Sequence, residues 1–270
     1  MSLPEFNKVV VIGASGGIGS AIAKSLLTQC RQLCLTGRDV DRLEALRGEL
    51  MLGASDDAAT ITTAVADISE QQGRDTVVQL CTDDQMADLV ICAAGQNGMG
   101  MFYDQPPETI QAIVHTNLLS VMLLVRGLVD RASSRGPMQI ILFGSVLGNI
   151  GMPGYSAYCA SKFGLKGFAQ ALDRELCDEG IRVRLFSPRT TATSMNNEKM
   201  MHLNELLGNQ VDSVSVVVKQ FLSFLAKDHQ SRTLGAAERF FSLLNAVMPS
   251  LPAKVLKKKV SVIKRVCGSD

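Results

Sequence analysis

A phenol, an ammonium group and a hydroxyl group occur in this 270-residue sequence at a spacing that suits proton transfer. Tyr158 and Lys162 are four residues apart, so on a helix they lie on one face, one turn from each other. Ser145 follows the apolar run 140–143, which is typical of a short buried strand. Three glycines and a proline lie between Ser145 and Tyr158 and allow the chain to loop back before a helix begins. The three side chains can therefore converge on one cleft.

A phenol is a poor acid-base group at neutral pH because its reference pKa is about 10. A cation one turn away favours the phenolate, so Lys162 would tune Tyr158 for proton transfer. A Tyr followed four residues later by a Lys also arises by chance, as a ring packed under an alkyl stem. Of the three tyrosines in the chain, Tyr158 alone has such a partner.

The composition is that of an ordinary soluble globule, with 46% hydrophobic and 20% charged residues. A net charge of +1, no Trp and 5% aromatic residues give no reason to expect a nucleic-acid partner. The seven cysteines form no C-x-x-C pair, which argues against a metal site and a disulfide framework and favours a reducing cytoplasm. No long apolar segment precedes the first strand, so we expect neither a signal peptide nor a membrane span there.

The first strand, 8–12, leads directly into a glycine-dense turn and a helical stretch, 20–29. Such a turn can be only a tight corner, but after a strand it also makes an anion site, because backbone N–H groups and the helix dipole face a phosphate. The turn residues expected to contact that phosphate are Gly13, Ser15, Gly16, Gly17, Ile18 and Gly19.

The tips of the next strands would meet the rest of a dinucleotide. Strand 33–36 ends at Gly37 and Arg38, where an acid would favour NAD, and a guanidinium there favours the 2′-phosphate of NADP. The alternative is a surface arginine paired with a neighbouring aspartate. Strand 60–66 ends at Asp67 and Ile68, and the carboxylate either accepts from the adenine amine or caps the following helix.

Strand and helix patterns alternate along the chain, with a helix at 40–52, a strand at 88–91, helices at 108–115 and 117–131, and a strand at 181–186. Small residues, Cys92, Ala93, Ala94 and Gly95, follow the strand at 88–91 and let the backbone pass close to a flat ligand. The alternation predicts an α/β fold, a single Rossmann-type doubly wound parallel sheet with helices on both faces and ligands at the carboxyl ends of its strands.

With these motifs the chain resembles the short-chain dehydrogenase/reductase family over nearly its whole length, and most of all an NADP-preferring bacterial subgroup. The matching residues are the turn at 13–19, Asp67, Ala94, Gly95, Asn117, Ser145, Tyr158, Lys162, Pro188 and Thr193. The resemblance implies that Tyr158 exchanges a proton with the substrate oxygen, which Ser145 hydrogen-bonds.

The same resemblance assigns the remaining roles. Lys162 would hold the nicotinamide ribose and lower the pKa of Tyr158, and Asn117 would anchor a water that relays protons from Lys162. Thr193 would hold the carboxamide, with Pro188 and Thr191 beside it. The cofactor itself supplies the hydride.

The sequence departs from the family pattern in three places. Cys92 and Ala93 replace two asparagines, so polar support must come from elsewhere. Arg189 follows Pro188 where the family has glycine. The closing strand is not recognisable after Gln230, which puts a tetramer in doubt and leaves a homodimer as the expected assembly.

The residues expected around the substrate are mainly apolar and rich in methionine, including Met99, Met101, Met152, Met195, Met200 and Met201. Methionine suits apolar ligands of variable shape, although any one of these side chains can equally fill the core. We expect segment 195–207 to form a lid, and only Arg189 or His202 to be available for a substrate carboxylate.

These observations predict an NADP(H)-dependent oxidoreductase that interconverts a carbonyl and an alcohol on a mainly apolar substrate, with acyl- or lipid-like compounds as candidates. A non-catalytic NADP(H)-binding regulatory protein on the same fold is the alternative. We expect residues 1–235 to form the catalytic domain and residues 236–270 a helical extension of it.

The C-terminal stretch 254–267 predicts a helix with an apolar face and a lysine-rich face. Two interpretations are open. The apolar face docks on the globule or on a partner subunit, or the helix lies on an anionic membrane surface and makes the protein peripheral to the membrane.

Overall fold

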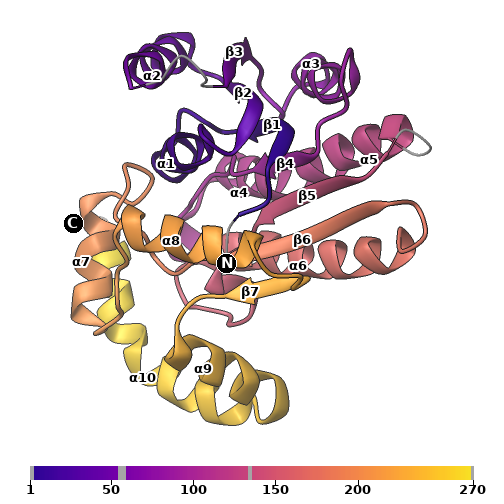
Figure 1. Ribbon diagram of the computed structural model, residues 1–270. Coiled ribbons are helices and arrows are strands. Elements are labelled where there is room, and N and C mark those ends of the chain that lie inside the picture. Colours follow the sequence, from indigo (N-terminus) through magenta and orange to yellow (C-terminus); the bar gives the residue numbers. More distant parts are fainter. Residues whose placement is uncertain (1–2, 54–58, 133–135, 269–270) are drawn as a thin grey trace.

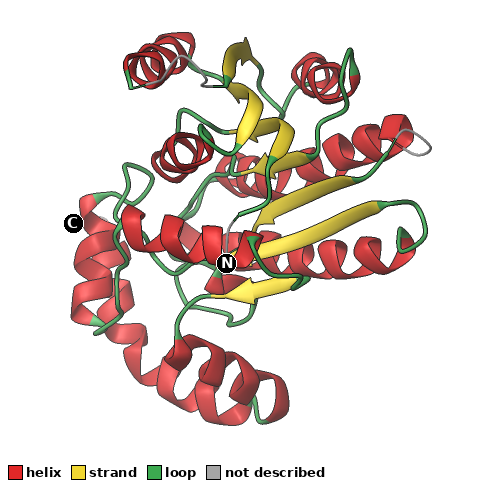
Figure 2. Cartoon of the chain, in the orientation of Figure 1, coloured by secondary structure: helices red, strands yellow, loops and turns green. Residues whose placement is uncertain are grey.

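The computed structural model describes residues 3–53, 59–132 and 136–268. Seven strands form one parallel sheet in the order β3-β2-β1-β4-β5-β6-β7, with helices on both faces (Figures 1 and 2). After β3 the chain crosses to the other side of β1, so the order of strands reverses between β1 and β4 and leaves a crevice at their carboxyl ends. The predicted doubly wound Rossmann-type fold is confirmed.

The strands are β1 Phe6–Ile12, β2 Cys30–Gly37, β3 Thr60–Val65, β4 Leu89–Cys92, β5 Met138–Phe143, β6 Ile181–Ser187 and β7 Ser231–Thr233. The α-helices are α1 Gly17–Leu26, α2 Val40–Leu52, α3 Gln71–Thr82, α4 Pro107–Val114, α5 Ser120–Ala132, α6 Ser156–Glu175, α7 Glu198–Leu206, α8 Val214–Leu225, α9 Ala236–Val247 and α10 Ser250–Cys267. Three short turns of helix join them: η1 Phe102–Asp104, η2 His115–Leu119 and η3 Val146–Gly148.

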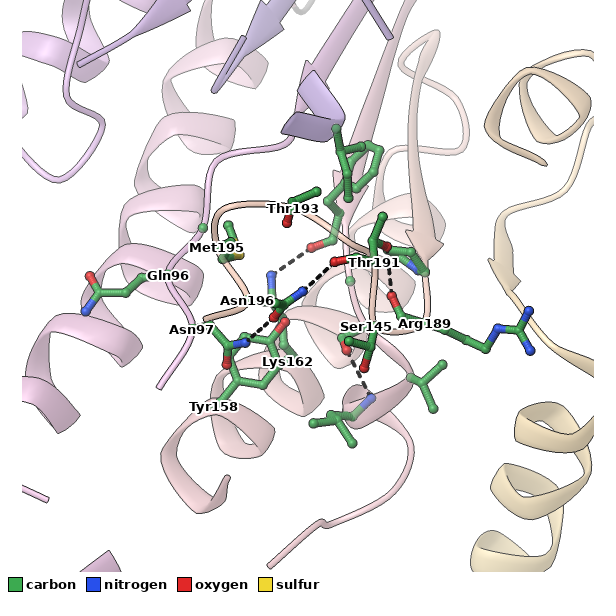
Figure 3. Close-up of a pocket in the computed structure, with 18 of the residues that line it drawn as sticks. Gln96, Asn97, Ser145, Tyr158, Lys162, Arg189, Thr191, Thr193, Met195 and Asn196 are labelled. Carbon is green, nitrogen blue, oxygen red and sulfur yellow. Dashed lines mark hydrogen bonds between the residues drawn. The ribbon is translucent and has the colours of Figure 1, made fainter. Parts of the chain in front are cut away.

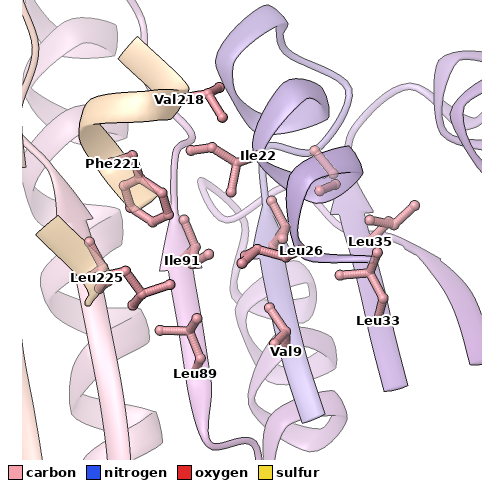
Figure 4. Close-up of a cluster of buried hydrophobic side chains, with 14 of the residues drawn as sticks. Val9, Ile22, Leu26, Leu33, Leu35, Leu89, Ile91, Val218, Phe221 and Leu225 are labelled. Atoms are coloured by element: carbon pink, nitrogen blue, oxygen red, sulfur yellow. The ribbon is translucent and has the colours of Figure 1, made fainter. Parts of the chain in front are cut away.

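The strands are continuous apolar runs because helices cover both faces of the sheet. Val9 and Val11 of β1 face one hydrophobic layer, while Val10 and Ile12 face the other. On the first face α1 and α8 pack over the centre of the sheet. Figure 4 shows Ile22 and Leu26 of α1 and Phe221 of α8 beside the strand side chains Val9 and Ile91. Helices α3, α5 and α6 supply the buried side chains of the second face.

The predicted helix at 40–52 has the bounds of α2, and the other predicted elements up to β6 are found with shifts of a few residues. The closing strand, which was not recognisable in the sequence, is present in the structure. Residues 231–233 of β7 pair in parallel with 185–187 of β6. This strand has only three residues, and none of them is apolar. It therefore leaves no hydrophobic pattern from which a strand could be predicted.

The two helices predicted at 108–115 and 117–131 are one helix in the structure, interrupted by the π turn η2. This helix, Pro107–Ala132, is long and apolar enough to span a membrane. Its apolar side chains Leu124, Val125 and Leu128 are buried against the sheet. The helix is therefore apolar because it forms part of the protein core. Insertions of a π turn in helices occur frequently at functional sites.

The C-terminal helix begins at Ser250, four residues before its predicted start. Pro252 lies in the first helical turn, where a missing N–H group costs no intrahelical hydrogen bond. Helices α9 and α10 form a hairpin that projects beyond β7 in Figure 1, and α10 runs back alongside α7. The apolar face of α10 therefore docks on the globule, the first of the two interpretations, with Ile263 fully buried.

Candidate active site

A cleft of about 1170 Å³ lies at the carboxyl ends of the strands. Loops after β1, β2, β3, β4, β5 and β6 line it, and α9 and α10 close one end. Apart from Asn117, every residue assigned to catalysis or to cofactor binding lines this cleft: Gly13, Ser15, Gly16, Gly17, Ile18, Gly19, Arg38, Asp67, Ile68, Ala93, Ala94, Gly95, Ser145, Tyr158, Lys162, Pro188, Thr191 and Thr193.

The glycine turn forms the floor at β1. Gly13 has a φ of +80°, and a Cβ there would lie 2.7 Å from the backbone nitrogen of Ala94, so only glycine fits. Gly16 precedes α1 and offers no side-chain cap, which leaves the first N–H groups of the helix available to an anion. A Cβ on Gly17 would meet the Thr193 side chain at 2.9 Å, so the segment after β6 lies directly over the turn.

Arg38 and Asp67 lie together at the adenosine end. The closest charged atoms are 3.8 Å apart, but the Arg38 side chain is 70% exposed, so this ion pair holds it weakly. Burial tends to raise the pKa of Asp67, but hydrogen bonds from the Ser69 hydroxyl and backbone, with the charge of Arg38, bring it below its usual value. Asp67 does not cap α3, because its Oδ1 accepts both Ser69 bonds.

A second cation, Arg42, also lines this end of the cleft. Arg42 was not predicted, although its place in the first turn of the helix that follows Arg38 could have indicated it. Asp39 caps α2 by accepting from the Arg42 backbone at 3.0 Å, which fixes the strand-to-helix corner that carries both guanidinium groups.

Ser145 and Tyr158 approach each other at the centre of the cleft. The hydroxyl of Ser145 caps η3 by accepting from the Leu147 backbone at 3.1 Å. Burial raises the pKa of Tyr158 to about 12, against the lowering effect of a hydrogen bond with Ser145. Tyr158 is therefore protonated at neutral pH.

Lys162 is buried one turn below Tyr158 on α6, as its spacing predicted. Its Nζ donates to the backbone oxygen of Phe143 at 2.8 Å and lies 5.8 Å from the centre of the Tyr158 ring. Burial lowers the pKa of Lys162 to about 8. Burial dominates the pKa of Tyr158, and the Lys162 ammonium group points to the end of β5, so a lowering of the Tyr158 pKa by Lys162 stays a prediction.

Asn117 lies in the π turn η2 and is fully buried behind the cleft. Its side chain accepts from the Gln96 backbone at 2.7 Å, donates to the Gln96 oxygen at 2.8 Å and donates to the Ser161 hydroxyl at 3.1 Å. Asn117 thus fixes the loop after β4, and supplies the polar support that Cys92 and Ala93 lack. A Cβ on Gly95 would meet Asn117 Oδ1 at 3.3 Å and Lys162 Nζ at 3.7 Å.

Arg189 is not available for a substrate carboxylate. Its guanidinium donates to both oxygens of the buried Asp212, at 2.9 and 2.6 Å, and contacts Glu238 of α9 at 3.5 Å. In Figure 3 the Arg189 side chain points away from Ser145 and Tyr158. His202, the other side chain considered, lies on the exposed side of α7, near Glu205.

The loops after β4 and β6 meet above Tyr158. Asn97 donates to the Asn196 side chain at 3.0 Å, and Asn196 donates to the Thr191 oxygen at 2.7 Å (Figure 3). Neither asparagine was predicted from the sequence, because each lies in a loop that has no periodic pattern or motif. The two hydrogen bonds hold the loop that carries Thr191 and Thr193 over the cleft.

The substrate side is apolar, and the methionines divide between two roles. Met152 and Met195 line the cleft, while Met200 is buried between α7 and α10. Apolar side chains from the C-terminal hairpin, including Phe241 and Val255, also line it and were not predicted. The motion of the predicted lid at 195–207 stays a prediction.

Comparisons with known proteins agree with this geometry. A family model described as short chain dehydrogenase matches residues 7–204. The chain is 30% identical over 209 residues to the 3-oxoacyl-(acyl-carrier-protein) reductase of Bos taurus, covering 76% of this chain and 86% of the relative. It is 29% identical over 205 residues to a 3-dehydrosphinganine reductase of Arabidopsis thaliana, covering 75% of this chain and 60% of the relative.

The fold is similar to that of a short-chain dehydrogenase from Sphingobium yanoikuyae solved in complex with NADPH. The two chains share 25% sequence identity and a TM-score of 0.76, with 91% of this chain and 95% of the other covered.

Proposed function

Because the chain belongs to the short-chain dehydrogenase family, we propose that it is an NADP(H)-dependent oxidoreductase that interconverts a carbonyl and an alcohol on a mainly apolar, acyl- or lipid-like substrate. The observation that carries the proposal is the convergence of Ser145, Tyr158 and Lys162 on the cleft that the glycine turn lines. NADPH, when bound, supplies the hydride.

The cleft fits a dinucleotide along its length. The close approach of Gly13 to Ala94 leaves a groove beside the free N–H groups at the start of α1, suited to the pyrophosphate. Exposed Arg38, with Arg42 at the same end of the cleft, suits a 2′-phosphate. Small residues at Ala93, Ala94 and Gly95, and the loop at 188–193, would hold the nicotinamide half.

Tyr158 would donate its proton to the substrate oxygen, and the Ser145 hydroxyl would hydrogen-bond the same oxygen. A pKa of about 12 keeps Tyr158 protonated at neutral pH, which favours reduction of a carbonyl. Lys162, still charged below pH 8, would stabilise the phenolate left behind. Asn117 would position the loop after β4.

The substrate class is inferred from the lining and from the relatives. Met152, Met195, Leu203, Leu207 and Phe241 give the cleft an apolar lining. Two relatives are named as reductases of a 3-oxoacyl group and of 3-dehydrosphinganine, which are acyl or lipid ketones.

We further propose a homodimer, formed by the outer faces of η2, α5 and α6. Leu119, Met122, Leu123 and Phe163 are exposed there although they are large and apolar. The molar mass in solution should be twice that of the chain, and Leu123→Glu should halve it. A wild-type monomer would contradict this assembly.

We also propose that residues 1–235 form the catalytic domain and 236–270 a helical extension of it, in the cytoplasm. The support is the burial of Ile263 against α7 and the free state of all seven cysteines. Limited proteolysis of the native protein should first remove the extension and leave a folded core.

Consumption of NADPH with a panel of carbonyl compounds tests the proposed activity. The panel should contain short ketones, medium and long 3-oxoacyl thioesters, and a charged keto acid as a polar control. We expect turnover that rises with chain length and is lost in Tyr158→Phe. NADPH binding without turnover of any compound would instead support the non-catalytic alternative.

A further inference from the structure

One face of the C-terminal hairpin is apolar and uncovered. No residue of α9 is buried, and Phe240, Leu243 and Val247 are each more than 60% exposed. Their spacing of three and four residues puts them on one side of the helix. Met248 and Leu251 continue the exposed apolar surface into the start of α10. Contiguous apolar surfaces of this kind on a soluble protein usually mark a binding site.

The same surface turns basic along α10. Lys254, Val255 and Lys258 follow Leu251 at offsets of three, four and seven residues, so all four lie on one exposed stripe. Lys257 is exposed beside this stripe. An apolar segment thus passes directly into a cluster of lysines on one side of the hairpin.

The charge of this region differs from that of the rest of the chain. Residues 239–268 contain seven Lys and Arg and no Asp or Glu. Since the whole chain has a net charge of +1, the remainder carries −6. The positive charge is therefore concentrated on the element that exposes the apolar face.

The opposite side of the hairpin is fixed to the globule. Ile263 is fully buried among side chains of α6 and α7, and Lys259 donates to the Leu207 oxygen at 2.9 Å. Asn245 of α9 donates to the Asn149 oxygen at 3.1 Å. These contacts hold the hairpin in one orientation, with Phe240, Leu243 and the lysines directed away from the body.

We infer that this face, residues 240–258, docks on the surface of an anionic lipid bilayer. Exposed aromatic and aliphatic side chains bordered by lysines are the combination that binds the interface of such a membrane. A second copy of the chain is disfavoured, because a two-fold contact would pair this face with itself, and the segment contains no acid to pair with its lysines.

The docking face is continuous with the active-site cleft. Phe241 and Val255 lie at its edge, are partly exposed, and also line the cleft. An apolar substrate dissolved in the bilayer would enter there without crossing water. This last step rests on the proposed function, whereas the docking itself does not.

Flotation of the full-length chain with vesicles tests the inference. Vesicles of phosphatidylcholine with one-third phosphatidylserine should carry the protein at low salt and release it as salt is raised, and pure phosphatidylcholine vesicles should not. Turnover of a short water-soluble ketone, measured without vesicles, reports separately on the proposed reaction.

Two variants separate the apolar and basic contributions. Phe240→Glu with Leu243→Glu should reduce vesicle binding at least tenfold, whereas Leu52→Glu, at an exposed position on α2, should not. Charge reversal at Lys254, Lys257 and Lys258 should weaken binding about a hundredfold. The matched reversal at Arg31, Lys219 and Lys227, which are exposed elsewhere, should have a smaller effect.

Neither set of hairpin variants touches the residues around Tyr158, so turnover of the soluble ketone should be unchanged. Protein that stays with the solution at low salt overturns the inference. So does equal binding to both kinds of vesicle. A dimer that Phe240→Glu with Leu243→Glu converts to monomers would assign the face to a second copy, and binding of an acidic protein without binding of vesicles would assign it to that partner.

Discussion

The sheet and the C-terminal hairpin are built in opposite ways. In β1, Val9, Val10 and Val11 are completely buried between two layers of helices. In α9 no residue is buried, and the hairpin is held by Ile263 of α10, by the partly buried Val262, Val266 and Cys267 beside it, and by a few polar contacts. The sheet and the α6 helix packed on it position the glycine turn and Tyr158, and a catalytic site needs such a well-packed support. The hairpin closes the other end of the cleft. The difference separates the elements that carry Ser145, Tyr158 and Lys162 from the hairpin at the end of the cleft.

The largest expected effect lies on the sheet side. Tyr158→Phe keeps the ring but removes the proton, so kcat should fall by about a thousandfold, within the range for loss of an acid-base group. The affinity for NADPH, measured by fluorescence titration, should change little. A variant with near wild-type turnover would show that another group is the acid.

A matched pair of core substitutions compares the two regions directly. Ile91→Ala in β4 should lower the free energy of unfolding by about 2–5 kcal/mol, because it leaves a cavity in the sheet core. Ile263→Ala should instead release α10, with a small change in global unfolding and faster proteolysis within 236–268.

The control for both is Val247→Ala, at an exposed position on α9. Urea unfolding and limited proteolysis measure the two readouts. If Ile263→Ala lowered the global stability as much as Ile91→Ala does, the hairpin would be part of the same cooperative unit as the sheet.

The pH dependence of reduction reports on Lys162. Burial lowers its pKa to about 8, so the ammonium form is present below that pH and is lost above it. Beyond about pH 8, kcat/KM should therefore fall by up to about tenfold per pH unit. Lys162→Arg should move the fall to higher pH, since a guanidinium keeps its proton. A wild-type profile flat to pH 10 would contradict the role of Lys162.

The smallest expected effect concerns cofactor choice. NADPH should bind at least tenfold more tightly than NADH, a difference of about 1.4 kcal/mol. Arg38→Ala should bring the two affinities close together, and Arg42→Ala should reduce the ratio by less. Isothermal titration calorimetry with NADPH and with NADH measures the ratio of the two affinities. A ratio that Arg38→Ala leaves unchanged would assign the discrimination to other residues.

The sequence alone determined much of the sheet and its turns, because these depend on local rules. Apolar runs mark strands that are covered on both faces, and α2 has the bounds that its pattern predicted. Tyr158 and Lys162 share a face of α6 because four residues make about one helical turn. These features depend on neighbours in the sequence, and so they can be recognised without the fold.

Only the tertiary structure decided the rest. The partners of Arg189 lie at positions 212 and 238, and those of Asn117 at 96 and 161, separations at which no periodicity operates. The pKa of Tyr158 depends on how deeply the ring is buried and on its hydrogen bond with Ser145, 13 residues away in the sequence. The amphipathic pattern of α10 was visible in the sequence. Its docking on α7 depends on contacts between residues far apart in the chain, and no local pattern reveals them.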